Sequence, residues 1–128
     1  MRAIFLIAVI LATSAACYGQ STRTYSSSCG LGARWEETEN GWNGTWTRRG
    51  NSNIFDAAWR NGSATGSSVL TMTLNGNRVH IERRDSGSFG GATVTYDGTI
   101  SSNGTVTGTG HASTMAQSYS FSANITCG

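Results

Sequence analysis

The 128-residue chain contains no lysine and no proline, and it has only two histidines and three cysteines. A metal centre needs three or four convergent ligands, and no His-x-His, His-Glu-x-x-His or close Cys/His pair occurs. The chain also lacks a Gly-x-Ser-x-Gly nucleophile elbow and a phosphate-binding glycine loop that leads into a helix. We therefore expect no enzymatic activity, no metal and no cofactor.

Charge is sparse and almost balanced, with nine basic and seven acidic residues. A surface for nucleic acid or for anionic membranes needs a clear basic excess, so neither partner is expected. Long apolar runs are missing as well. The run from Ala3 to Ala12 is shorter than the roughly 20 residues that a membrane-spanning helix requires, so we expect no membrane span.

The N-terminus has the order of residues found in a secretory signal peptide. Met1 and Arg2 precede the short apolar run, and small residues follow it. We expect residues 1–19 to be a removed signal peptide, residues 20–33 a mobile N-terminal segment, and residues 34–128 a single β-barrel domain. The predicted location is secreted or periplasmic.

The cleavage site decides how many cysteines remain. Cleavage after Gly19 removes Cys17 and leaves an even number, which in an oxidising compartment predicts a Cys29–Cys127 disulfide. Cleavage after Ala16 leaves Cys17 at the new N-terminus. Residues 11–17 resemble a bacterial lipoprotein signal, although Ser14 stands where a branched aliphatic residue is usual. In this alternative Cys17 is lipidated and anchors an outer-membrane lipoprotein.

From about Trp42 onward, apolar residues recur at every second position, which is the period of half-buried strands and not of helices. The alternating runs fall at residues 55–60, 70–74, 78–82, 93–100, 105–107 and 118–127. Asn75-Gly76 and Asn103-Gly104 suit tight hairpin turns, and Asn61–Ser67 is expected to be a looser connection. The pattern predicts an all-β, antiparallel up-and-down meander that closes into a barrel of seven or eight strands, with a β-sandwich as the alternative.

Two groups of charged residues are expected to lie on the outside of this fold. Glu36, Glu37 and Glu39 precede the alternating runs and predict a solvated segment. His80 and Glu82 alternate with the apolar residues of their own run, so they predict a polar outer face.

A short stretch resembles two known groups of barrels. Gly44-Thr45-Trp46, followed by Gly50 and Ser52, resembles the first strand of avidin-like barrels and is similar to the Gly-x-Trp opening of lipocalins and other calycins. The resemblance implies a barrel in which the tryptophan closes one end, often with an arginine packed across it. Biotin binding is not implied, because Arg48 stands near the place of a polar biotin contact. In size and layout the chain also resembles small exported bacterial inhibitors of proteases and lysozymes.

A barrel of this size is either filled by its side chains or holds one small ligand, and we expect a mostly filled interior. Our first hypothesis is a non-catalytic exported binding module for a small molecule or an exported protein. Trp46, Arg48 and Trp59 are predicted at the barrel mouth and form the candidate ligand site together with Tyr96. Arg48 either stacks on a tryptophan or binds an anion. The alternatives are an envelope inhibitor that acts through the Asn61–Ser67 loop, and a structural or surface protein.

Overall fold

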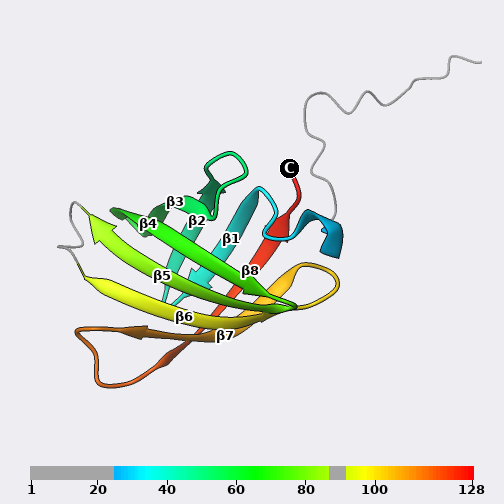
Figure 1. Cartoon of the computed structure of the whole chain (residues 1–128). Coiled ribbons are helices and arrows are strands. Elements are labelled where there is room, and N and C mark those ends of the chain that lie inside the picture. Colours follow the sequence, from blue (N-terminus) through cyan, green and yellow to red (C-terminus); the bar gives the residue numbers. More distant parts are fainter. Residues whose placement is uncertain (1–24, 87–91) are drawn as a thin grey trace, which may run out of the picture.

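The computed structural model describes residues 25–86 and 92–128, and its strands form a closed antiparallel barrel (Figure 1). The strands are β1 (Arg34–Glu39), β2 (Trp42–Arg48), β3 (Ile54–Asn61), β4 (Ala64–Asn75), β5 (Arg78–Ser86), β6 (Thr93–Ile100), β7 (Thr105–Ala112) and β8 (Tyr119–Thr126). Each strand pairs with the next in sequence, and β1 pairs with β8 to close the barrel. The predicted all-β meander is confirmed as a barrel of eight strands. The predicted signal peptide and Cys17 lie outside the described residues.

Aromatic side chains fill the middle of the barrel. Successive residues of a strand point to opposite faces of the sheet, so every second side chain enters the interior. Trp46 lies among three other rings, with centroid distances of 5.5 Å to Trp35 and 5.7 Å to both Trp59 and Tyr96. Each of these four residues is at most 2% exposed. Aromatic pairs at these distances attract one another beyond the effect of burial alone.

Gly44 of the Gly-Thr-Trp stretch is required by this aromatic packing. A Cβ atom at Gly44 would lie 2.6 Å from the ring of Trp59 and 2.8 Å from Nε1 of Trp46. Only glycine lets both rings lie against the backbone of β2 at this point. The stretch belongs to the second strand of the barrel and not to the first, which differs from the avidin-like pattern.

Strand β1 occupies a segment that the alternation of apolar residues does not predict. Trp35, Glu37 and Glu39 point into the barrel, and the two glutamates are only 1% and 8% exposed. The expectation of a solvated acidic segment is therefore wrong for Glu37 and Glu39, and it holds only for the outward Glu36. Two of the three inward positions of β1 carry carboxyl groups, and for this reason the strand looks polar in the sequence.

The connection between β3 and β4 is also tighter than expected. Asn61 pairs with Ala64 and Arg60 pairs with Thr65, so only Gly62 and Ser63 form the turn. Gly62 has a φ of 58°, a backbone conformation that glycine adopts without steric cost. The expected loose Asn61–Ser67 loop is wrong, because most of its residues belong to paired strands.

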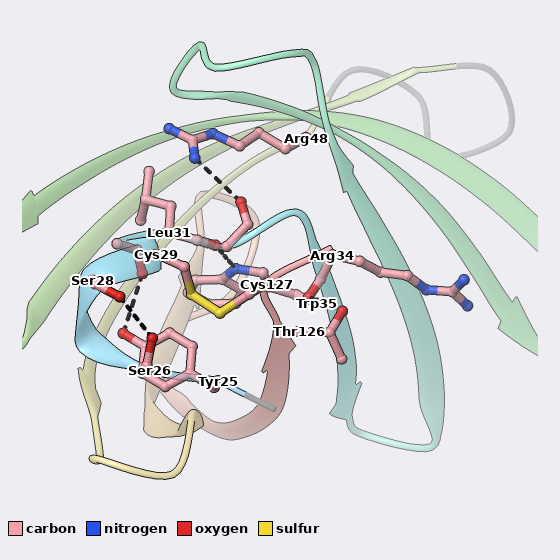
Figure 2. The surroundings of a disulfide bond; sticks show 12 residues. Tyr25, Ser26, Ser28, Cys29, Leu31, Arg34, Trp35, Arg48, Thr126 and Cys127 are labelled. Carbon is pink, nitrogen blue, oxygen red and sulfur yellow. Dashed lines mark hydrogen bonds between the residues drawn. A yellow bond between two sulfur atoms is a disulfide. The ribbon is translucent and has the colours of Figure 1, made fainter. Parts of the chain in front are cut away.

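The segment before β1 covers one end of the barrel, which we call the closed end (Figure 2). The predicted disulfide is confirmed, and it joins Cys29 of the short 3-10 helix η1 (Ser27–Cys29) to Cys127, just after β8. Leu31 is buried beside it, and its carbonyl oxygen accepts a hydrogen bond of 2.7 Å from Nε1 of Trp35. Ala33 extends the contact by donating its backbone N–H to the carbonyl oxygen of Thr126 at 2.8 Å. Residues 29–33 are thereby joined to the first strand and to the end of the last strand.

Candidate functional site at the open end of the barrel

The opposite end of the barrel, which we call the open end, contains a pocket of about 270 Å³. Its volume is close to the lower limit of about 300 Å³ for small-molecule sites. Its walls include Trp42, Trp59, Val94, Met115 and Tyr119, and its charged residues are Glu39, Arg83 and Asp85. The pocket therefore combines aromatic and apolar walls with a compact group of charges.

Arg83 is the centre of this charged group. Its Nε lies 2.5 Å from Oδ1 of Asp85 and its Nη2 lies 3.0 Å from Oδ2, which makes a bidentate pair. Its Nη1 donates to Oε1 of Glu39 at 3.0 Å. The three side chains are 10% exposed or less. Burial acts to lower the pKa of Arg83, but the hydrogen bond to Asp85 and the charge of Glu39 outweigh it and raise the pKa, so Arg83 stays charged.

Strands β3 and β4 contribute side chains that hold this charged group from one side. Ser68 lies opposite Asp85 in the β4–β5 register and donates its hydroxyl to Oδ1 of Asp85 at 2.6 Å. The same Ser68 hydroxyl accepts a hydrogen bond of 2.8 Å from Nε1 of Trp59. The guanidinium carbon of Arg83 lies 4.4 Å from the centroid of a Trp59 ring, which is a cation–π contact. The tryptophan that Arg83 contacts is Trp59 and not Trp46 of the Gly-Thr-Trp stretch.

Tyr96 of β6 contacts the charged group from inside the barrel. Its hydroxyl accepts a hydrogen bond of 2.6 Å from Nη1 of Arg83 and donates one of 2.5 Å to Oε1 of Glu39. Burial raises the pKa of the Tyr96 hydroxyl well above its ordinary value, and the charge of Glu39 adds to this effect. Tyr96 therefore keeps its proton and remains a donor to Glu39 at neutral pH.

Glu37 lies one inward position deeper in β1 and has no comparable partners. Within residues 25–86 and 92–128, neither of its carboxyl oxygens has a hydrogen-bond partner, and the same is true of Nε1 of the buried Trp46. Burial raises the pKa of Glu37 to about 9, and the charge of Glu39 adds to the shift while that of Arg83 opposes it. At neutral pH Glu37 is therefore a neutral acid.

The four predicted site residues fall into three different settings. Trp59 lines the pocket, and Tyr96 lies beneath it as a partner of its charges. Trp46 is fully buried in the aromatic core. Arg48 lies at the closed end and donates to the carbonyl oxygens of Gly32, Asn51 and Ser52 at distances of 2.6 to 3.2 Å (Figure 2). Backbone carbonyls, and not a tryptophan ring, receive its guanidinium.

The charged residues of the pocket are absent from the sequence-based prediction, although β5 carries a signal for two of them. Arg83 and Asp85 continue the inward parity of Val79 and Ile81. A charge at an inward position of a barrel strand must find a partner inside the barrel. If the alternation is continued past Val79 and Ile81, it predicts that Arg83 and Asp85 lie in the interior.

No family model matches the chain, and it matches neither a curated protein nor a solved structure. In the described ranges, no helix is long and apolar enough to cross a membrane. The same two ranges contain no group of three His, Cys, Asp or Glu residues that could hold a metal ion. Fold and site together define a disulfide-linked, eight-stranded barrel with a charged, aromatic-walled pocket at one end.

Proposed function

We propose that this protein is a non-catalytic, exported binding module that holds a small molecule in the pocket at its open end. The observation that carries the proposal is the difference between the two ends of the barrel. The closed end is covered by a disulfide-linked segment, whereas the open end has a pocket of about 270 Å³ with aromatic walls and fixed polar groups. Concave apolar sites with a few well-placed polar groups are typical of small-molecule binding.

The order of the polar groups also supports binding. Glu39, Arg83 and Asp85 are held by one another and by Ser68 and Tyr96, so their positions do not depend on a ligand. A site that is already ordered loses less conformational entropy on binding, and this improves affinity.

Export is part of the proposal. It is supported by the signal-like order of residues 1–19 and by the Cys29–Cys127 disulfide, which is consistent with an oxidising compartment. Lipidation at Cys17 remains the alternative form of the exported protein, and the intact mass of the mature chain distinguishes the two. A relation to avidin-like or calycin barrels is likewise proposed, on the shared barrel architecture and the Gly-x-Trp stretch.

A pocket-filling substitution tests the proposed site. Ala112 is buried at the pocket wall, and Ala58 is exposed on the outer face of β3, so Ala112→Leu fills the pocket and Ala58→Leu is its matched control. We expect small-molecule fragments to shift the NMR signals of Met115 and Tyr119 in the native protein and in Ala58→Leu, but not in Ala112→Leu. The proposal fails if a broad fragment panel shifts no signal at the open end. It also fails if Ala112→Leu binds as well as the native protein.

A further inference from the structure

We propose that the ligand of this pocket is a small organic cation, an amine or a quaternary ammonium ion with a compact apolar body. This inference rests on the proposed function, because it names the class of molecule that the same pocket holds. Three features of the open end carry it: the balance of charges, the engagement of Arg83, and the chemistry of the walls.

The first feature is an excess of negative charge. Among the described residues that line the pocket, two carboxylates, Glu39 and Asp85, face one guanidinium, Arg83. Both carboxylates lie within 3.0 Å of that guanidinium, so the group as a whole carries one net negative charge. An unbalanced charge in a partly buried site interacts strongly with an incoming ion, because the local dielectric constant is well below that of water. A cation completes the balance, whereas an anion increases the imbalance.

The second feature is that Arg83 is already engaged by the protein. Among the described residues, it donates two hydrogen bonds to Asp85, one to Glu39 and one to Tyr96. A planar guanidinium recognises anions through the same N–H groups. An anionic ligand would therefore compete with these two carboxylates for the guanidinium.

The third feature is the aromatic wall. Trp42, Trp59 and Tyr119 line the pocket, and the faces of such rings attract cations. Trp59 already binds one cation in this way, since Arg83 lies over it. Val94 and Met115 add apolar surface for the body of a ligand, and the volume of about 270 Å³ limits that body to a small one.

Glu37 is buried near the charged group and provides a second way to test the inference. Its buried carboxyl has no hydrogen-bond partner among the described residues. The charged groups that act on it are Glu39 of its own strand and Arg83 of β5. Its paired neighbours on β2 and β8, Gly44 and Ala123, carry no titratable side chain. A bound cation would favour ionisation of Glu37, so binding of the cation is expected to release a proton from this residue.

Three probes with one common body test the class of ligand at pH 7. They are phenethylamine, phenethyl alcohol and 3-phenylpropionate, which are cationic, neutral and anionic, and binding is followed by titration of the Met115 and Tyr119 NMR signals. We expect the amine to bind about tenfold more tightly than the alcohol, and the carboxylate to bind most weakly. Equal or tighter binding of 3-phenylpropionate overturns the inference, and so does the absence of any shift with phenethylamine. If the alcohol or the carboxylate binds at the open end while the amine does not, the proposed binding function stands and only the cationic class is wrong.

A charge-removing variant tests the same point from the side of the protein. Glu39→Gln retains an oxygen that accepts from Arg83 and Tyr96 but removes the excess negative charge. Glu82→Gln makes the same change on the outer surface, where the Glu82 side chain is 71% exposed. We expect phenethylamine affinity to fall about tenfold in Glu39→Gln and to remain unchanged in Glu82→Gln. Unchanged affinity in a folded Glu39→Gln overturns the inference, and if that variant does not fold, the three probes on the native protein decide.

The proton linkage is tested with benzyltrimethylammonium, whose charge does not change with pH. We expect its affinity for the native protein to rise between pH 7 and pH 9, because the Glu37 proton becomes easier to release over this range. In Glu37→Met the affinity is expected to stay constant over the same range. A pH-independent affinity in the native protein contradicts the role given to Glu37.

Discussion

Replacing Glu37 by methionine is expected to stabilise the barrel, although it removes a charged residue type from the interior. Glu37 is 1% exposed, and neither of its carboxyl oxygens has a hydrogen-bond partner among the described residues. Methionine has a similar length and no group that must be solvated or protonated. A buried polar group without partners costs free energy, and substitution by an apolar residue of the same shape removes that cost.

The size of the effect follows from the pKa of Glu37. Its pKa rises from 4.5 to about 9 on folding, so the folded state holds a proton that the unfolded chain releases. The contribution of Glu37 to stability is therefore complete below pH 4.5 and is lost as the pH rises to about 9, by about 1.4 kcal/mol per pH unit. At pH 7, this amounts to about 3 kcal/mol in the free energy of unfolding, a cost that Glu37→Met does not carry.

Urea unfolding of both proteins at pH 5, 7 and 9, with the disulfide intact, measures this difference. We expect Glu37→Met to become increasingly more stable than the native protein as the pH rises from 5 to 9, with a difference on the order of 3 kcal/mol at pH 7. The exposed Glu82→Gln serves as the control and should show no such trend. A difference that does not depend on pH, or a variant that is less stable at every pH, refutes the assignment of Glu37 as a buried neutral acid.

Three further predictions concern the closed end and the packing between strands. Replacing Cys29 and Cys127 by serine should lower the free energy of unfolding by about 4 kcal/mol, because the disulfide closes a loop with a sequence separation of 98 residues; denaturant titration of the double variant against the oxidised native protein measures this loss. Arg48→Gln should lower the free energy of unfolding by about 1–3 kcal/mol, because it removes the hydrogen bonds to three carbonyl oxygens, while fragment binding at the open end stays unchanged. A loss of binding at constant stability would contradict this structural role of Arg48. Gly108→Ala should lower the free energy of unfolding by about 1–3 kcal/mol or more, because its Cβ would lie 2.0 Å from the carbonyl oxygen of Asp97. A lower melting temperature checks this expectation. An unchanged melting temperature would contradict the close approach between β6 and β7.

Most of the fold can be predicted from the sequence because its strands bury one face each. From β2 to β8 the inward positions are mainly apolar, so a period of two predicts the strands and their hairpin order. Strand β1 is the exception, since Glu37 and Glu39 occupy two of its three inward positions. The pattern fails where the interior is polar, and that is also where the strand contributes to the candidate site.

The site itself could be predicted only in part. The parity of β5 places Arg83 and Asp85 inside, but it does not say which groups neutralise them. Glu39, the partner of Arg83, lies 44 residues away in the sequence and on a strand that is not adjacent in the barrel. Such a pair depends on the curvature of the whole sheet and on the register of every strand between its members. The same dependence explains why Arg48, which lies close to Trp46 in the sequence, is found at the closed end and not at the pocket.

The position of the disulfide has a consequence for the order in which the barrel forms. Seven of the eight strand pairings join neighbours in the sequence, whereas the eighth pairs Arg34 of β1 with Thr126 of β8 across almost the whole domain. Bringing distant segments together has an entropic cost that slows folding. The Cys29–Cys127 bond lies beside this last pairing, so once it has formed, the first and last strands meet as readily as the two arms of a hairpin. Oxidation thus changes the slowest pairing of the meander into a local one, and the oxidised chain is expected to refold faster than the reduced chain.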